Sequence, residues 1–102
     1  MIRLALALGL VSAGPALADP IAEGARFAEE NCARCHAVGT SDESPLPEAP
    51  AFRTLSQRYP VEQLAEALAE GIVTAHPDMP EFQLEPAQIE AFLAYLESVQ
   101  TR

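Results

Sequence analysis

Hydrophobic residues recur at helical spacing in three stretches of the chain, and each stretch predicts one α-helix. The first begins at Asp19 and Pro20, which suit an N-cap and a first helical position, and it carries the chain to its cysteines. The second begins at Pro60 and stops at Gly71, and the third begins at Pro86. The apolar positions of these helices are Ile21, Gly24, Ala25, Ala28 and Cys32, then Val61, Leu64, Ala65, Leu68 and Ile72, and finally Ile89, Phe92, Leu93, Leu96 and Val99.

Two proline-rich segments separate the predicted helices. The segment from Thr40 to Pro50 combines prolines with serine and aspartate, a composition typical of loops, and a short helical stretch from about Phe52 to Arg58 follows it. The second segment runs over residues 75–80. No stretch has the alternating pattern of a strand. We therefore expect an all-α fold of three main helices plus short helical segments.

The first eighteen residues are typical of a secretory signal peptide. Arg3 precedes an apolar run from Leu4 to Val11, and Ala16–Ala18 fits the A-x-A cleavage pattern. The run is too short to span a bilayer, and it lacks the polar face that an uncleaved amphipathic anchor would need. Cleavage after Ala18 would leave a single exported domain, residues 19–102, with no membrane span. We expect this domain in the periplasm.

The region after Ala18 is strongly acidic. It carries five arginines, no lysine and fifteen carboxylates, so its net charge is −10. This balance excludes nucleic acid and disfavours anionic membrane surfaces as partners. The charge serves either solubility alone or attraction to a basic docking face on a partner protein, and the sequence leaves both readings open.

The candidate chemistry lies in the run Cys32-Ala33-Arg34-Cys35-His36, which is the C-x-x-C-H attachment motif of a c-type haem. On a helical turn the two thiols face the same way, so both can form thioethers along one edge of a porphyrin. The imidazole of the next residue can then reach the iron. A chain this short buries little apolar surface by itself, so a covalent haem would also stabilise its core.

Other uses of paired cysteines fit less well. A structural zinc site needs four Cys or His ligands, and the chain contains two cysteines and two histidines. A thioredoxin-like dithiol needs a βαβ context, which the pattern lacks. A disulfide between Cys32 and Cys35 would close a loop of only two residues. Dithiol redox chemistry is the main alternative to haem attachment.

A second axial ligand of the haem iron is expected from the second proline-rich segment. After Ala18, Met79 is the only methionine, and His76 is the only histidine besides His36. Pro77 and Pro80 restrict the backbone around Met79, so its thioether would be presented from a stiff loop. A methionine ligand would also raise the reduction potential above that of a bis-histidine site. We predict Met79 as the ligand; His76 is the alternative ligand, and ordinary core packing is the alternative role of Met79.

In this order along the chain, the motifs resemble the small class I c-type cytochromes, and the resemblance covers all of residues 19–102. It rests on Gly24, eight residues before Cys32, on the C-x-x-C-H motif and on three weaker sequences. These are Ala49-Pro50-Ala51-Phe52, Asp78-Met79-Pro80-Glu81-Phe82 and Ile89-Glu90-Ala91-Phe92-Leu93-Ala94-Tyr95-Leu96. The resemblance implies a class I cytochrome c-like fold around one haem c, with thioethers at Cys32 and Cys35 and with His36 and Met79 as iron ligands.

The resemblance also implies roles for residues outside the haem motif. Gly24 should let the first and last helices cross closely, with Phe92 and Tyr95 at the contact. His36 Nδ1 should donate to a backbone carbonyl, expected to be that of Pro50. The other pocket residues would be Phe52, Leu64, Leu68 and Phe82, for which simple core packing predicts the same burial, and the candidates to hold the haem propionates are Arg53, Arg58 and Tyr59.

Two departures from the family's pattern affect what can be carried over. Many members place an aromatic residue four positions before the first cysteine, where this chain has Ala28, with Phe27 one step earlier. We therefore expect a rotated helix contact or a smaller side chain at it. The mitochondrial members present lysines around the haem edge, and this chain has none, so the identity of the partner is not carried over.

The function implied is that of a periplasmic monohaem electron carrier between redox partner proteins, not an enzyme. A cytochrome subunit that relays electrons within a periplasmic oxidoreductase complex is the first alternative, and an exposed apolar patch around the haem edge would favour it. A gas-binding or peroxidatic haem requires that Met79 does not bind the iron. Thiol-disulfide exchange requires that no haem is attached.

Overall fold

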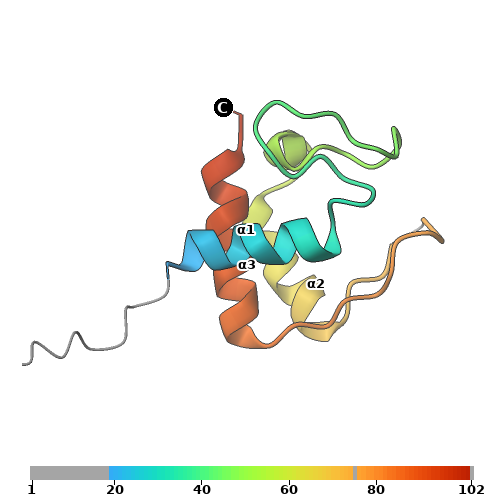
Figure 1. The fold of residues 1–102 in the computed structure, drawn as a ribbon. Coiled ribbons are helices and arrows are strands. Elements are labelled where there is room, and N and C mark those ends of the chain that lie inside the picture. Colours follow the sequence, from blue (N-terminus) through green and yellow to red (C-terminus); the bar gives the residue numbers. More distant parts are fainter. Residues whose placement is uncertain (1–18, 75, 102) are drawn as a thin grey trace, which may run out of the picture.

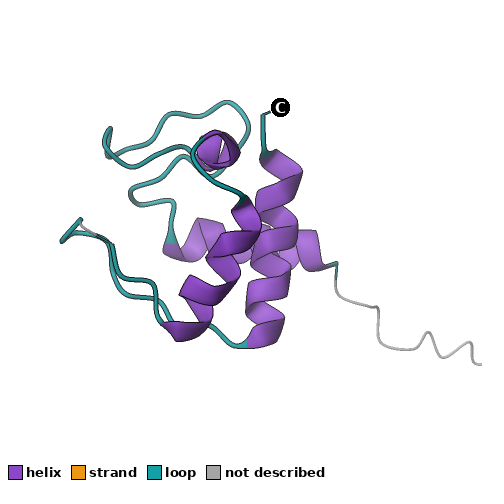
Figure 2. Ribbon diagram, turned by 180° about the vertical axis from the view of Figure 1, so that it is seen from behind, coloured by secondary structure: helices purple, strands orange, loops and turns teal. Residues whose placement is uncertain are grey.

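The computed structural model describes residues 19–74 and 76–101, which form three α-helices and two short 3₁₀ helices (Figure 1). The α-helices are α1 (Pro20–Asn31), α2 (Leu64–Glu70) and α3 (Pro86–Val99), and the 3₁₀ helices are η1 (Phe52–Gln57) and η2 (Val61–Gln63). These residues contain no strand (Figure 2), which confirms the all-α prediction. The proposed signal peptide, residues 1–18, lies outside the described residues.

The helix starts follow the expected capping chemistry. Asp19 Oδ1 accepts a hydrogen bond from the N–H of Ile21 at 3.0 Å at the start of α1. At the start of α3, the Gln88 side chain accepts from the N–H of Glu85 at 3.0 Å. Each bond satisfies a backbone donor at the helix start, so both helices begin where the sequence predicts.

The helix ends differ from the prediction in two places. Helix α1 ends at Asn31, one residue before the motif, and Cys32 is its C-cap. The helix predicted from Pro60 begins as the 3₁₀ turn η2 and ends at Glu70, which leaves Ile72 outside it. Gly71 stops this helix as expected, because its φ of 104° is a conformation that residues with a Cβ rarely adopt.

Helices α1 and α3 cross closely at Gly24, as expected. A Cβ atom on Gly24 would lie 2.1 Å from the carbonyl oxygen of Ala91 and 2.7 Å from the Cβ of Tyr95. The nearest residues on α3 are therefore Ala91 and Tyr95, not Phe92. The Phe92 ring packs instead on that of Phe27, with ring centroids 5.5 Å apart, so Phe27 supplies the aromatic contact of α1.

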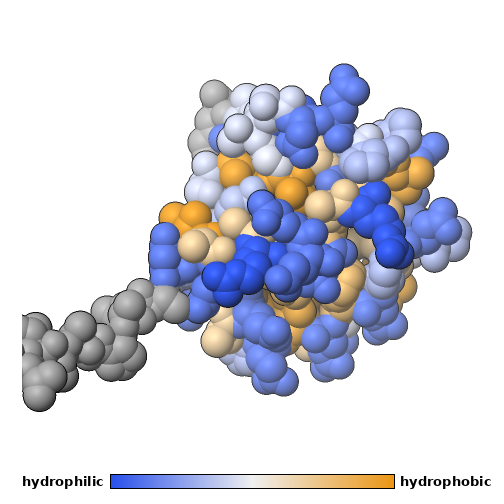
Figure 3. All heavy atoms as spheres, viewed as in Figure 1, coloured by the Kyte–Doolittle hydropathy of each residue, from blue (hydrophilic) through white to orange (hydrophobic). Residues whose placement is uncertain are grey.

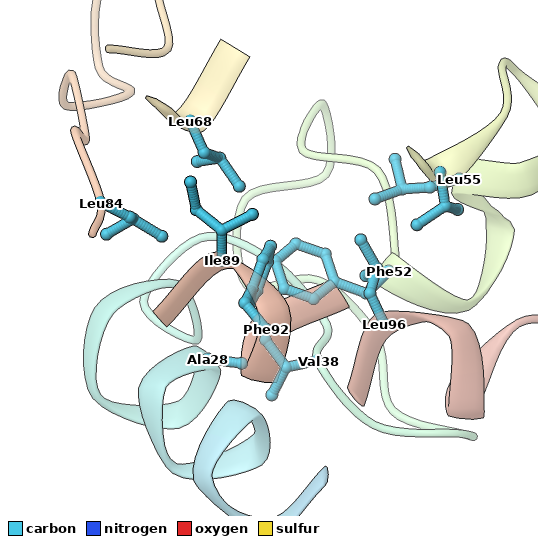
Figure 4. Packing of buried hydrophobic residues seen from close by; sticks show 10 residues of the cluster. Ala28, Val38, Phe52, Leu55, Leu68, Leu84, Ile89, Phe92 and Leu96 are labelled. Atoms are coloured by element: carbon cyan, nitrogen blue, oxygen red, sulfur yellow. The ribbon is translucent and has the colours of Figure 1, made fainter. Parts of the chain in front are cut away.

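One hydrophobic core joins the helices and the short segments between them. The rings of Phe52 and Phe92 lie at its centre, between leucines from η1 and α3 on one side and from α2 and the following loop on the other (Figure 4). Its buried members are Ala28, Val38, Phe52, Leu55, Val61, Leu68, Leu84, Ile89, Phe92 and Leu96. The face viewed in Figure 3 is largely hydrophilic, with hydrophobic side chains in small groups.

The segment between α2 and α3, described over residues 71–74 and 76–85, is a loop; we call it the distal loop. Its two legs are joined to each other by a hydrogen bond from the N–H of Ile72 to the carbonyl of Phe82 at 2.9 Å. The N–H of Leu84 donates to the carbonyl of Leu68 at 2.8 Å and holds the second leg against α2. The distal loop projects to one side of the helices (Figures 1 and 2).

Among the helices of the described residues, none combines the length and hydrophobicity needed to cross a membrane.

Candidate functional site

The C-x-x-C-H motif forms a single turn at the end of α1. The N–H of Cys32 donates to the carbonyl of Ala28 at 2.8 Å. The N–H groups of Cys35 and His36 both donate to the carbonyl of Cys32, at 3.1 and 2.9 Å. This turn brings both cysteines and His36 together, and both thiols are free and half-buried.

His36 is held through one ring nitrogen. Its Nδ1 lies 2.7 Å from the carbonyl oxygen of Pro50, the partner that the resemblance implied. A carbonyl oxygen only accepts, so Nδ1 carries the proton and the lone pair is on Nε2. The ring of Phe52 packs beside the imidazole, with centroids 5.0 Å apart and planes inclined by 42°. His36 therefore presents Nε2 as an oriented ligand nitrogen.

The loop of residues 37–51, which carries Pro50, is fixed by hydrogen bonds at several points; we call it the proximal loop. The N–H of Ala37 donates to Ser44 Oγ at 2.9 Å, and the N–H of Leu46 donates to the carbonyl of Cys35 at 3.1 Å. Tyr95 on α3 donates its hydroxyl to the carbonyl of Val38. These supports could not be predicted from the sequence, since Ser44, Leu46 and Val38 belong to no motif.

Burial changes the chemistry of the first thiol. It raises the pKa of Cys32 from 9.0 to about 11, because the surrounding apolar groups disfavour a thiolate. Dithiol oxidoreductases need the opposite, a lowered pKa that supplies a nucleophilic thiolate near neutral pH. The environment of Cys32 therefore argues against thiol-disulfide exchange.

The expected pocket residues belong to the hydrophobic core around the motif. Phe52 and Leu68 are buried, whereas Leu64 and Phe82 are partly exposed. Edge-to-face ring contacts connect Phe82 to Phe27 at 6.2 Å and continue through Phe92 to Phe52, and the tilted contact of Phe52 with His36 completes the series. Burial of this kind is equally typical of a plain core, so it does not by itself assign these residues to a haem pocket.

The two candidates for the second axial ligand lie in the distal loop. The N–H of Met79 donates to the carbonyl of His76 at 3.1 Å, which forms a tight turn there. The Met79 side chain is half-buried and that of His76 is exposed. Among the residues that the structure describes, no hydrogen bond or ring contact joins Met79 to His36. Met79 therefore lies on a separate element from the motif.

The three propionate candidates do not form one group. Arg53 Nη1 donates to the backbone carbonyl of Asp42 at 2.7 Å and lies 3.7 Å from its carboxylate, so Arg53 braces the proximal loop. Arg58 is exposed, and together with Tyr59 it lines a surface concavity of about 350 Å³ that Arg53 does not line. Burial raises the pKa of Tyr59, and the neighbouring Arg58 charge partly opposes this shift. Arg53 thus has a contact that Arg58 and Tyr59 do not share, and the roles of all three toward the propionates stay predictions.

Comparison with known proteins supplies the family. The family model of cytochrome c matches residues 21–100, which include the C-x-x-C-H motif, the distal loop and every helix except the first residue of α1. The chain belongs to the cytochrome c family. Searches of curated proteins and of solved structures give no significant match. Membership of this family implies an electron-transfer protein with covalently bound haem c and redox partner proteins. It confirms the family and the all-α cytochrome c fold that were predicted from the sequence.

Both the thiols and the imidazole of the motif fit haem c. The two thiols are free, they lie on one turn and they are partly shielded from water. His36 has its Nδ1 committed to Pro50, so Nε2 is the nitrogen left for iron. This donor set is the one that covalent haem attachment and proximal ligation require.

Proposed function

We propose that this protein is a periplasmic monohaem cytochrome that carries single electrons between redox partner proteins. The observation that carries the proposal is the turn of Cys32, Cys35 and His36, in which both thiols are free and the Pro50 carbonyl orients the imidazole. Bound haem c would supply the reversible one-electron chemistry of its iron. Export is supported by the signal-like pattern of residues 1–18.

Each site residue has a separate task in this proposal. Cys32 and Cys35 hold the group through thioethers, and His36 supplies the proximal nitrogen. Its hydrogen bond to Pro50 keeps the ring in one orientation and raises its basicity. Met79 supplies a thioether as the second ligand, which closes the iron to external ligands. Phe52, Leu64, Leu68 and Phe82 exclude water from the pocket.

The exposed apolar residues favour a free carrier over a permanent subunit. Ile21, in α1, and Val73, in the distal loop, are the large hydrophobic residues of the described chain that are exposed, with 45% and 78% of their surface accessible. They lie in different segments. Single exposed apolar residues of this kind are normal on monomeric proteins, whereas a stable subunit interface needs a contiguous patch.

The decisive experiment is an absorption spectrum of the protein expressed with a cytochrome c maturation system, before and after extraction with acid-acetone. Haem that stays with the chain after extraction supports the proposal. Extractable haem, or none, overturns it. Mass spectrometry of the same sample adds the number of haems and the N-terminus, which we expect at Asp19.

Attraction to a basic partner is tested by the salt dependence of the reaction. With a net charge of −10 after Ala18, electron transfer to a basic partner should slow steeply as salt rises, because charges further apart than about 10 Å are screened at 0.1 M. Rates that do not change with ionic strength would assign the charge to solubility and the docking to apolar contacts.

A further inference from the structure

The side chain that caps α3 also binds the short helix beside His36. Gln100 is the C-cap of α3 and is half-buried. Its Oε1 accepts a hydrogen bond from the N–H of Ser56 at 2.8 Å. Its Nε2 donates to the carbonyl oxygens of Phe52 at 2.6 Å and Leu96 at 2.8 Å. Three of the four hydrogen-bonding positions of this amide are therefore used, two for bonds to η1 and one for a bond back to α3.

The next residue adds a backbone bond to the same helix. The N–H of Thr101 donates to the carbonyl of Arg53 at 2.8 Å, while the Thr101 side chain is exposed and takes no part in this bond. The C-terminal end of α3 is thus bonded to η1 at Phe52, Arg53 and Ser56. The Gln100 bonds come from its side chain and the Thr101 bond from its backbone, so substitution of Gln100 removes the former and leaves the latter in place.

The first turn of η1 in turn determines where the imidazole lies. The N–H of Phe52 donates to the carbonyl of Ala37, the neighbour of His36, at 2.9 Å. The ring of Phe52 packs on that of His36, and Pro50, which accepts the His36 Nδ1–H, lies two residues before Phe52. A shift of Phe52 would therefore move both supports of the imidazole together.

We infer that Gln100 is a positioning residue for the proximal histidine, acting through Phe52 and Pro50. This inference rests on the proposed function, in which His36 Nε2 is the iron ligand. A loosened bond between His36 Nδ1 and Pro50 makes the imidazole a weaker electron donor, because the second-shell acceptor raises ligand basicity. A weaker donor favours the ferrous state, so the reduction potential rises.

The test compares three variants of the holoprotein with the parent. Gln100→Met keeps the length of the side chain and removes its hydrogen bonds. Gln100→Glu keeps an acceptor for Ser56 but places a second oxygen against the carbonyls of Phe52 and Leu96. Thr101→Ala is the matched control, because the bond of Thr101 to η1 comes from its backbone. The readouts are exchange of the His36 Nδ1–H with solvent, followed by NMR in the reduced protein, the midpoint potential and the unfolding midpoint.

We expect Nδ1–H exchange about tenfold faster in Gln100→Met and Gln100→Glu, the fold-change that corresponds to loss of about one hydrogen bond. The potential should rise in both variants, and Thr101→Ala should match the parent. Unchanged exchange and potential in both Gln100 variants, with only a lower unfolding midpoint, would reduce Gln100 to a helix cap. Failure of both variants to accumulate as holoprotein, with a normal Thr101→Ala, would also overturn the inference, since Gln100 would then be needed for folding.

Failure of the proposed function would be seen in the parent protein itself. A parent without covalent haem, or one in which the His36 ring protons lack the large upfield shift of a haem-bound imidazole, removes the premise. A parent with both features whose Gln100 variants behave like it contradicts only the role of Gln100.

Discussion

The proximal loop and the distal loop are supported in different ways. The proximal loop is hydrogen-bonded to several other elements. It accepts bonds from Tyr95 on α3 and from Arg53 on η1, and its own Leu46 donates a bond to Cys35 of the motif. The hydrogen bonds of the described residues of the distal loop are internal, run to the end of α2, or cap the start of α3 at Glu85. Those to α2 include one from the Gln83 side chain to the carbonyl of Ala69 at 3.3 Å.

This difference indicates where the protein is preorganised. The orientation of His36 is determined by tertiary hydrogen bonds, so we expect it to be rigid whether or not the second ligand binds. The position of Met79 depends on a turn within an exposed loop, so binding of its thioether would itself complete the order of that loop.

The largest effect is expected from the thiols that anchor the proximal side. Because two thioethers need both sulfurs, replacement of Cys32 and Cys35 together by alanine should release all haem to acid-acetone, and each single substitution should leave one linkage or a poorly accumulating protein. Arg34→Gln, at the exposed residue between them, is the control and should keep covalent haem. Normal covalent haem in the double variant would contradict the attachment site.

The second largest effect concerns the distal loop. Met79→Ala should abolish the weak red charge-transfer band of methionine-ligated ferric haem and let the reduced protein bind carbon monoxide. Met79→His should stay six-coordinate, with its potential lowered by a sizeable share of the roughly 0.8 V over which axial ligands act. His76→Ala should change none of these properties. An iron opened by His76→Ala and not by Met79→Ala would identify a bis-histidine site.

Two glycines allow a comparison of stability between the regions. Gly24→Ala should destabilise the holoprotein by about 3 kcal/mol, because the added Cβ meets the backbone of Ala91 and the helices must separate. Gly71→Ala should destabilise by only about 1 to 2 kcal/mol, from the unfavourable φ, since the Glu81 carboxylate that it meets can move. Chemical denaturation measures both, with Ala22→Ser on the exposed face of α1 as the control. A larger loss for Gly71→Ala would reverse the comparison.

The smallest effect is expected from single side-chain hydrogen bonds. Tyr95→Phe removes the bond to Val38 and should destabilise by about 1 kcal/mol, whereas Gln83→Ala, which removes an exposed bond at the distal loop, should change stability by less than about 0.5 kcal/mol.

Burial, and then the charges of Glu29 and Asp42, raise the pKa of Tyr95 above its ordinary 10.0. The folded state therefore keeps this proton more tightly, so part of the stability is lost as the pH rises above about 10, and Tyr95→Phe should reduce that loss. Equal effects of Tyr95→Phe and Gln83→Ala would contradict the stronger support of the proximal loop.

The features that depend on local spacing could be predicted from the amino-acid pattern alone. Helical periodicity, the N-cap at Asp19 and the stop at Gly71 predicted the helices, because these signals act within one or two turns. The motif predicted covalent haem for the same reason: two thiols and an imidazole within five residues need only one turn to act together. The resemblance added the close crossing at Gly24 and the acceptor at Pro50, both of which are present in the fold.

Contacts between residues far apart in the chain could be seen only in the folded molecule. The position of Phe27 predicted a rotated helix contact, but not that Ala91 rather than Phe92 would lie against Gly24. Arg53 was expected to hold a propionate, yet its hydrogen bond goes to Asp42, eleven residues away along the chain. Gln100 lies outside every motif, and its role depends on the end of α3 reaching a helix 44 residues earlier. Long-range polar contacts of this kind arise from how the packed helices are oriented, which local pattern does not encode.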